Sequence, residues 1–357
     1  MRLDWRSALG LLLSALLLWW TLHGEPLGEV WLAIRHADWA LWALSTVLAT
    51  VIFPMRAIRW RLILAPVAAD VPYGPLWRAT AIGMMANNLL PARAGEVARA
   101  FALAREERRV SFAAALASLA VDRLFDAIVV LLLLFSALLD PAFPSGARIY
   151  GQTVPALARG LIGITVLLLV ALYVAVSVPD LLQRMWAFLA RRVAPRFERR
   201  GARAIAAFVE GLGVLRHPGR FAAVFAWTLA HWLVCVVSIW IGFRAVGIRA
   251  PFSAALFLNG LSSVASALPS SPGFFGVFES VSKVSLQLYR VDPTLAISWA
   301  LGYHILTFIP ITVFGLVYMT RLGLGLGALS HPPEPADPAS GPLDPGDGEV
   351  APAGSGA

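Results

Sequence analysis

One polar stretch, NNLLPARAGEVARAF, interrupts a chain that is otherwise largely apolar. It places Arg93, Glu96 and Arg99 at intervals of three residues, directly after the amides of Asn87 and Asn88. A guanidinium group carries a planar set of donors that suits phosphate oxygens, and a carboxylate between two such groups can hold their geometry. The spacing therefore indicates a phosphate-binding motif. The alternative is a self-neutralising Arg–Glu–Arg cap at a membrane surface.

A second polar group lies in the apolar run 111–139. Ser118, Asp122 and Asp126 recur every four residues and so share one helix face, with Arg123 beside them. A charge at the bilayer centre costs at least about 2.5–3.5 kcal/mol, so these residues are expected to face a partner or a wet cavity. Two interpretations stay open. The group takes part in binding and translocation, or one aspartate pairs with an arginine of the first motif and docks it.

A third polar group lies near the end of the chain. Glu279 and Lys283 stand at positions i and i+4, in the order that favours a local ion pair. His304 could carry a proton, although a lone helical histidine is more often a hydrogen-bonded packing residue. Together with Glu279, we consider Glu96 and Asp126 as proton carriers.

The composition predicts what must position these groups. The chain has 357 residues, of which 59% are hydrophobic and only 14% charged, whereas soluble domains carry roughly 25% charged residues. Six apolar runs approach or exceed the ~20 residues that cross a bilayer: 8–23, 38–64, 111–139, 156–178, 220–247 and 293–321. We therefore predict an all-α polytopic membrane protein with about six transmembrane helices.

Two further apolar segments, 75–103 and 251–289, are broken halfway, at LLPARAGE and ALPSSPGFFGVFE. Each half is too short to span comfortably, which predicts a re-entrant hairpin lined by protein or water. Prolines and glycines permit tight tips. The predicted tip residues are Pro91, Gly95, Pro269, Pro272, Gly273 and Gly276.

The order span, hairpin, span occurs twice, at about 38–139 and 220–321. Each copy breaks at Leu-Pro and then reaches a glutamate, Glu96 or Glu279. The span after each hairpin carries a polar pair, Asp122-Arg123 in the first copy and Tyr303-His304 in the second. One connecting span turns the second copy upside down, so we predict inverted repeats, a recurring plan of transporters.

Arginine placement predicts the orientation. The arginines at 56–61, 99–109 and 184–220 fall on one side if each hairpin returns to the side it enters from. The positive-inside rule makes that side the cytoplasm, together with both termini, in the cell's inner (cytoplasmic) membrane. The outer loops 24–37 and 140–155 carry one arginine each, Arg35 and Arg148.

The remaining segments complete the domain organisation. Residues 1–329 form one transmembrane domain. Within it, segment 180–219 forms either surface helices on the anionic inner leaflet or a plain basic linker. Residues 330–357 are rich in proline, glycine and acid, which predicts a disordered tail.

Other chemistry finds no support in the sequence. There is no Walker A sequence, zinc motif or Gly-x-Ser-x-Gly elbow, so we expect no enzyme, cofactor or metal. The single cysteine, Cys235, rules out a disulfide within one chain. The net charge of +8 comes from arginines clustered at helix ends, so we expect no nucleic-acid partner.

Three stretches in order, NNLLPARAGEVARAFAL, SFAAALASLAVDRLFD and ALPSSPGFFGVFE, resemble the flippase-like transmembrane region of lysylphosphatidylglycerol synthetases. The resemblance covers about residues 8–321. It implies an integral inner-membrane protein with a proposed role in moving lipids between leaflets. The soluble aminoacyl-transferring domain of bifunctional synthetases is not found in this sequence, so lysyl transfer is not implied. The family pattern often has an arginine near Tyr303-His304, where this sequence has none.

These observations predict a flippase or transporter for a phosphate-bearing lipid, whose headgroup enters near Arg93, Glu96 and Arg99. The expected partners are membrane lipids. A second copy or a pathway enzyme is left open as a protein partner. The alternative function is an accessory protein or transferase of a lipid-linked sugar or aminoacyl-lipid pathway, and a third is a scaffold without transport.

Overall fold

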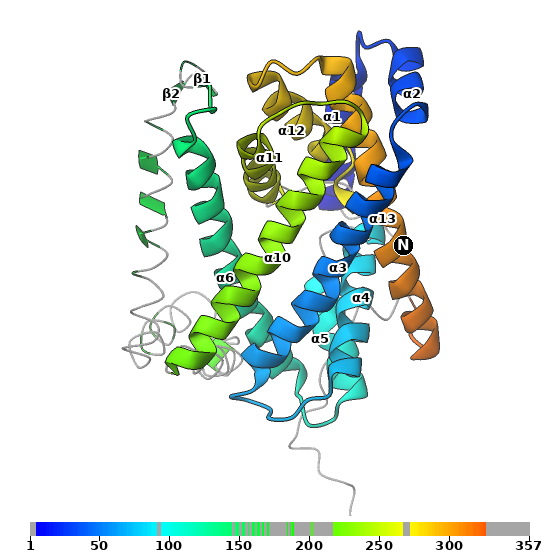
Figure 1. Cartoon of the computed structure of the whole chain (residues 1–357). Helices are drawn as coiled ribbons and strands as arrows, with labels where there is room; N and C mark the ends of the chain where they lie inside the picture. Colours follow the sequence, from blue (N-terminus) through cyan, green and yellow to red (C-terminus); the bar gives the residue numbers. More distant parts are fainter. Residues whose placement is uncertain are drawn as a thin grey trace, which may run out of the picture.

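The computed structural model describes residues 5–90, 94–144, 217–266 and 272–325, with isolated positions between 146 and 202. Within these residues the protein is helical except for two paired two-residue strands, β1 (Arg148–Ile149) and β2 (Gln152–Thr153) (Figure 1). The helices are α1 (Trp5–Leu22), α2 (Leu27–Arg35), α3 (Trp39–Leu64), α4 (Tyr73–Leu89), α5 (Gly95–Glu106), α6 (Phe112–Leu139), α10 (Pro218–Ala245), α11 (Phe252–Ala265), the 3-10 turn η4 (Pro272–Phe274), α12 (Val277–Leu288) and α13 (Pro293–Arg321).

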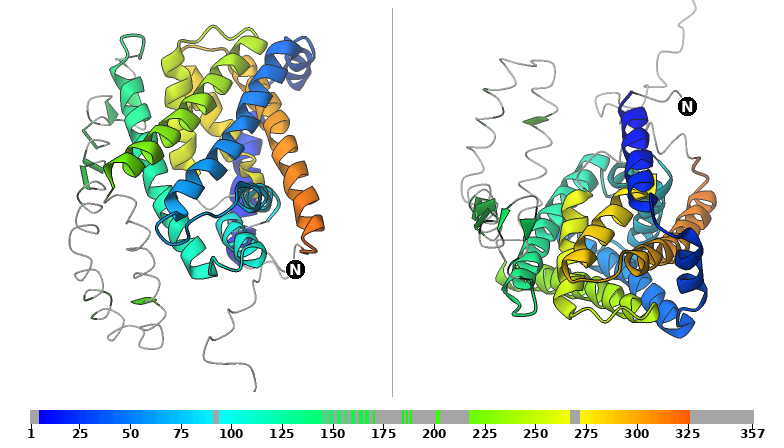
Figure 2. Two further views of the ribbon diagram at one scale, coloured as in Figure 1. Left: turned by 60° about the horizontal axis from the view of Figure 1, so that its bottom comes forward. Right: turned by 90° about the horizontal axis from the view of Figure 1, so that it is seen from above.

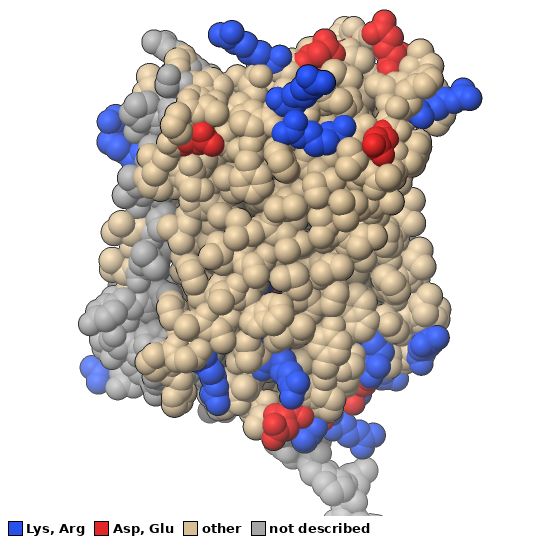
Figure 3. Space-filling view, viewed as in Figure 1, with Lys and Arg blue, Asp and Glu red and all other residues tan. Residues whose placement is uncertain are grey.

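The prediction of an all-α membrane protein is confirmed. Among the described helices, α3, α10 and α13 are long and apolar enough to cross a membrane. Helix α6 is 28 residues long but carries Asp122, Arg123 and Asp126 near its middle. Figure 3 shows charged side chains gathered at the two ends of one face, with an uncharged belt between them. Such a belt is the surface that lipid tails require.

Local signals set the helix ends. The side chain of Asp38 accepts hydrogen bonds from two backbone N–H groups at the start of α3, and Ser111 and Asp292 each accept one at the start of α6 and α13. The predicted spans 8–23, 38–64, 111–139, 220–247 and 293–321 therefore correspond closely to α1, α3, α6, α10 and α13. Apart from isolated positions, the predicted span 156–178 and most of the segment 180–219 lie outside the described residues, as does the whole tail 330–357.

Helices α4 and α5 form a closely packed antiparallel hairpin. The backbone N–H of Gly95 donates to Asn87 Oδ1 at 2.9 Å, and Arg78 Nε donates to Glu106 Oε1 at 2.9 Å at the open end. A Cβ atom added to Gly83 would lie 2.7 Å from the carbonyl oxygen of Gly95. Only glycine lets the two backbones approach this closely.

Substituting Gly83 tests this close contact. We expect Gly83→Ala to lower the free energy of unfolding by about 1–3 kcal/mol, because the added methyl group forces the two arms apart. The matched control is Gly219→Ala in α10, where an added Cβ meets no atom within 4 Å. Reversible unfolding in mixed micelles measures both. Equal stability of the two variants would contradict the close packing.

Helices α11, η4 and α12 form the second hairpin, with residues 267–271 at its tip outside the described part. Gly273 and Gly276 have positive φ angles of 69° and 86°, as glycine favours. A Cβ atom on Gly276 would lie 2.2 Å from the carbonyl oxygen of Ser14 in α1. Helix α12 thus packs against α1 on one side and against α13 on the other (Figure 2).

The two hairpins lie at opposite ends of the bundle. Figure 1 shows α4 and α5 in the lower half and α11 and α12 in the upper half. Helices α3 and α10 cross beside them and are joined by a hydrogen bond from Ser45 Oγ to the Ser238 carbonyl oxygen at 2.8 Å. This placement is what hairpins entering from opposite sides require. The inverted repeat itself stays a prediction.

Helix α2 was not predicted, and neither was the short strand pair β1–β2. The expected outer loop 24–37 contains α2, which packs against α13. Its Trp31 and Leu32 are exposed. Glu29 in the first turn and Arg35 in the last complement the helix dipole. The helix was missed because nine residues are too few to show a clear period of apolar residues.

Candidate functional site

Seven charged side chains meet inside the bundle, between the first hairpin and helices α3 and α6. They comprise four arginines and three carboxylates, so the cluster carries a net charge of +1. Helix α3 provides Arg56 and Arg59, α5 provides Glu96 and Arg99, and α6 provides Asp122, Arg123 and Asp126.

Arg59 is the centre of this cluster and is fully buried. Its Nη2 lies 2.6 Å from Asp122 Oδ1, and its Nη1 donates to Asp126 Oδ1 at 2.7 Å. Trp232 of α10 donates its Nε1–H to the same Asp126 oxygen at 2.9 Å. Ser118 is also buried, so the predicted shared face of α6 is the face that packs inward.

Arg99 is buried as well and does not line the cavity described below. Its Nη1 lies 3.4 Å from Asp122 Oδ2, and its guanidinium carbon lies 4.1 Å over the ring of Trp60. This geometry supports the docking interpretation, in which Arg99 fastens the first hairpin to α6. The other arginine of the predicted motif, Arg93, lies outside the described residues, as do Pro91 and Pro269.

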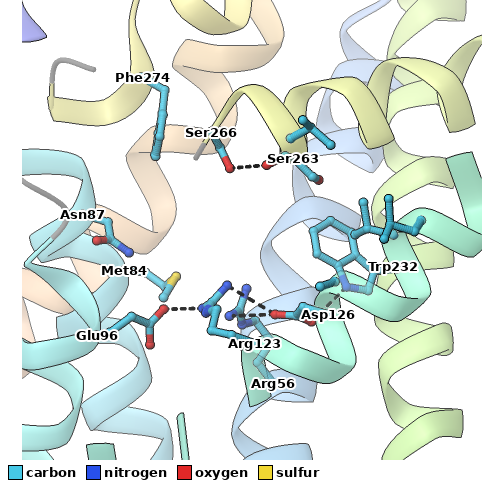
Figure 4. Close-up of a pocket in the computed structure, with 14 residues that line it drawn as sticks. Arg56, Met84, Asn87, Glu96, Arg123, Asp126, Trp232, Ser263, Ser266 and Phe274 are labelled. Carbon is cyan, nitrogen blue, oxygen red and sulfur yellow. Dashed lines mark hydrogen bonds and ion pairs between the residues drawn. The ribbon is translucent and has the colours of Figure 1, made fainter. Parts of the chain in front are cut away.

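A cavity of about 580 Å³ lies between the two hairpins. Figure 4 shows Arg56, Glu96, Arg123 and Asp126 along one side, with Phe274, Ser266 and Ser263 of the second hairpin opposite. Asn87 also lines it. The neighbouring Asn88 instead donates to Thr312 Oγ1 of α13 at 2.8 Å. The cavity therefore joins residues that are far apart in the sequence.

Two arginines give this cavity its positive side. The side chain of Arg123 is 42% exposed, pairs with Glu96, and lies 3.2 Å from Asp126 Oδ2. Arg56 is buried, and its Nη2 lies 3.6 Å from Asp126 Oδ2, which is too long for a hydrogen bond. Its Nε and Nη2 have no hydrogen-bond acceptor among the described residues. Unsatisfied charged donors are costly when buried, so this position is suited to an anion.

Sequence reasoning used Arg56 and Arg59 only as orientation signals and overlooked Trp232. A usable signal was present. Two arginines three residues apart inside an apolar run are spaced to meet two aspartates four residues apart on another helix. Their burial also follows from the cost of leaving them in lipid.

The second hairpin has a charged site of its own. Glu279 is fully buried, and His304 Nδ1 lies 2.6 Å from its Oε1. Lys283 instead lies 2.8 Å from Glu25 Oε1, beyond the end of α1. The predicted ion pair between Glu279 and Lys283 is therefore wrong. Packing against α13 and α1 gives each residue a closer partner than its neighbour on the helix.

The two halves share one arrangement. In each hairpin the second arm begins with a glutamate in its first turn, Glu96 in α5 and Glu279 in α12. In each, that glutamate pairs with a basic residue of the following long helix, Arg123 or His304. This correspondence supports the predicted repeat. It also places the predicted polar pairs next to the hairpins.

Comparisons with known proteins place the chain among membrane proteins. The sequence model of the lysylphosphatidylglycerol synthase transmembrane region matches residues 7–315. Glycosyltransferase AglD of Haloferax volcanii is 29% identical over 342 residues, which cover 89% of this chain and 54% of that protein. The chain thus spans about half the length of AglD. No solved structure matches the chain.

Two further relatives match over most of their own length. Both are called UPF0104 membrane protein and come from Methanothermobacter thermautotrophicus. One is 23% identical over 83% of this chain and 89% of the relative, and the other is 25% identical over 80% and 84%.

Proposed function

This chain belongs to the lysylphosphatidylglycerol synthase transmembrane-region family, and we propose that it moves a phosphate-bearing lipid between the leaflets of the cytoplasmic membrane. The observation that carries this proposal is the cavity between the two hairpins. Its buried Arg56 presents guanidinium donors without acceptors, and its Arg123 is partly exposed. Guanidinium groups recognise phosphate oxygens through charge-assisted hydrogen bonds.

The rest of the cavity suits a lipid. Its wall continues from the charged cluster to Val130, Leu131 and Val264, which are apolar. If Arg56 and Arg123 held the headgroup, the acyl or isoprenoid tails of the lipid would lie along this apolar part of the wall. Binding of an anion would also complement the surplus positive charge of the cluster. Glu96 and Asp126 would orient the arginines rather than contact the phosphate.

We place the first hairpin at the cytoplasmic side, together with both termini. The turn between α5 and α6 carries Arg108 and Arg109, and α3 ends with Arg61 at the same end of the bundle. The positive-inside rule favours that end for the cytoplasm. A headgroup would then enter beside the first hairpin and leave beside the second. No nucleotide-binding motif is found in the sequence, so movement would be downhill or ion-coupled.

Transport by the pure protein tests this proposal. Proteoliposomes would contain a panel of labelled phospholipids and polyprenyl phosphates, with wild type beside Arg123→Gln and the exposed Arg61→Gln as matched control. We expect selective movement of one lipid class by wild type and Arg61→Gln, and its loss in folded Arg123→Gln. Movement of no lipid, or unchanged movement in Arg123→Gln, would contradict the proposal.

A second candidate function follows from the relative named Glycosyltransferase AglD. We propose as the alternative that this chain is an accessory protein or a transferase of a lipid-linked sugar pathway. Incubation of the pure protein with an activated sugar and a polyprenyl phosphate distinguishes the two. Formation of a glycosylated lipid would favour the alternative, whereas movement of an unmodified lipid favours transport.

A further inference from the structure

His304 of α13 bridges two parts of the second hairpin. Its Nε2 lies 2.7 Å from the carbonyl oxygen of Gly273, and its Nδ1 lies 2.6 Å from Glu279 Oε1. A carbonyl oxygen only accepts, so Nε2 must carry a hydrogen. The contact at Nδ1 needs a second hydrogen of its own. Either an imidazolium donates it to the carboxylate, or a carboxylic acid donates it to the neutral imidazole.

Loss of that second proton would break one of the two contacts, because a neutral imidazole has a single N–H to donate. A neutral imidazole that donates through Nε2 presents a lone pair at Nδ1, and the carboxylate Oε1 presents another. Two acceptors 2.6 Å apart repel each other. The other oxygen of Glu279 already accepts the backbone N–H of Gly276 at 2.7 Å, so the carboxylate is held from one side only.

Other ionisable groups near this pair already have partners. Lys283 of α12 lies 2.8 Å from Glu25, and the Tyr303 hydroxyl of α13 lies 3.1 Å from Ser238 Oγ. In the described parts of the neighbouring elements, residues 12–22, 252–266 and 272–276 carry no charge. The described surroundings therefore offer no second cation to Glu279 when the proton leaves.

The pair also holds the wall of the cavity. Gly273 belongs to η4, and the next residue, Phe274, lines the cavity opposite Arg123 (Figure 4). The ring of Phe275 stacks on His304 with centroids 4.3 Å apart. A change in the bond between Glu279 and His304 would thus be transmitted to η4 by direct contact.

The corresponding pair of the first half differs in one chemical property. There the partner of the glutamate is Arg123, which stays charged at all physiological pH values. In the second half it is His304, whose imidazole, unlike a guanidinium, has both a neutral and a charged form. The second hairpin is therefore fastened by a contact in which both partners, the carboxyl group and the imidazole, can gain or lose a proton.

We propose that Glu279 and His304 form a proton-binding site whose occupancy holds the turn η4 of the second hairpin against the cavity. Release breaks one O–H or N–H bond and passes the proton to water, leaving a carboxylate and a neutral imidazole. Either the contact with Glu279 or the contact with Gly273 is then lost, so η4 is held less firmly against the cavity. Coupling of this proton to lipid movement rests on the proposed function, whereas the proton-dependent position of η4 does not.

The accessibility of η4 to a thiol reagent tests the proton site without any lipid. In a Cys235→Ser background, which removes the single cysteine, Phe274→Cys would be labelled with a thiol reagent across a pH series. The same series in Glu279→Gln gives the reference, because its amide N–H donates permanently to Nδ1. We divide the labelling rate of the Phe274→Cys protein by the rate of its Glu279→Gln variant. This ratio removes the effect of thiol ionisation, which is the same in both.

We expect this ratio to rise with pH, and His304→Ala to be labelled fast at every pH. A ratio that stays constant across the series, with all variants verified as folded, would overturn the proposal. A transport measurement then separates the two claims. If wild type moves lipid, an imposed proton gradient should change its rate but not that of Glu279→Gln, and equal responses would refute coupling. If wild type moves no lipid, the proposed function fails while the labelling still decides the proton site.

Discussion

Replacing Arg59 by methionine is expected to lower the free energy of unfolding by about 3–5 kcal/mol, the cost of removing one partner from a buried ion pair. Arg59 is fully buried and contacts both Asp122 and Asp126. Its loss leaves the two carboxylates facing each other on one side of α6. Reversible unfolding in mixed micelles would measure the difference between Arg59→Met and wild type.

Two further variants make this prediction specific. Arg61→Met alters an exposed arginine on the same helix and should change stability little. Adding Asp122→Asn to Arg59→Met should restore part of the loss, because the carboxylate that loses its shortest ion pair becomes neutral. If Arg59→Met were as stable as Arg61→Met, the charge cluster would not be what joins α3 to α6.

Arg56→Gln is expected to weaken binding of a phosphate-bearing lipid by about ten- to a hundred-fold, because a charge-assisted hydrogen bond contributes about 1.5–3 kcal/mol. Arg56 lines the cavity with two guanidinium nitrogens that have no hydrogen-bond acceptor among the described residues. Equilibrium binding of a labelled polyprenyl phosphate and a labelled phospholipid to the protein in micelles would measure the change. Arg56→Lys keeps the charge without the planar set of donors, so its loss of affinity should be smaller.

The outcome for a lipid without phosphate is part of the same prediction. Binding of a neutral lipid such as a diacylglycerol should respond little to Arg56→Gln, because it has no anionic group for the guanidinium. An unchanged affinity for the phosphate-bearing lipids in folded Arg56→Gln would show that their headgroup binds elsewhere.

The long helices could be predicted from the sequence because their signals are local. The apolar run 293–321 coincides with α13, where Asp292 caps the first turn and Arg321 lies in the last. The two hairpins were predictable for a similar reason. Proline and glycine divide each apolar stretch into two halves, and each half is too short to cross the bilayer. Helix α2 was missed because nine residues give little periodicity.

The partners of the buried charges could not be predicted in the same way. Spacing along a helix shows which residues share a face, but not which element packs against that face. Lys283 was the favoured partner of Glu279 by spacing, yet α13 brings His304 closer. Arg99 fitted a phosphate motif, yet its neighbours in the structure are Asp122 and Trp60. Contacts between distant segments decided both cases.

The position of a bound lipid on the protein tests most directly the claim that the cavity is the headgroup site. A photoreactive group placed beside the phosphate of a polyprenyl phosphate would be activated in proteoliposomes, and the labelled peptides mapped. We predict labelling of α4 around Met84 and of α6 around Val130, reduced by unlabelled polyprenyl phosphate and lost in folded Arg56→Gln. Labelling confined to the exposed surface of α13, such as Val313 and Val317, and unchanged in Arg56→Gln would contradict the account.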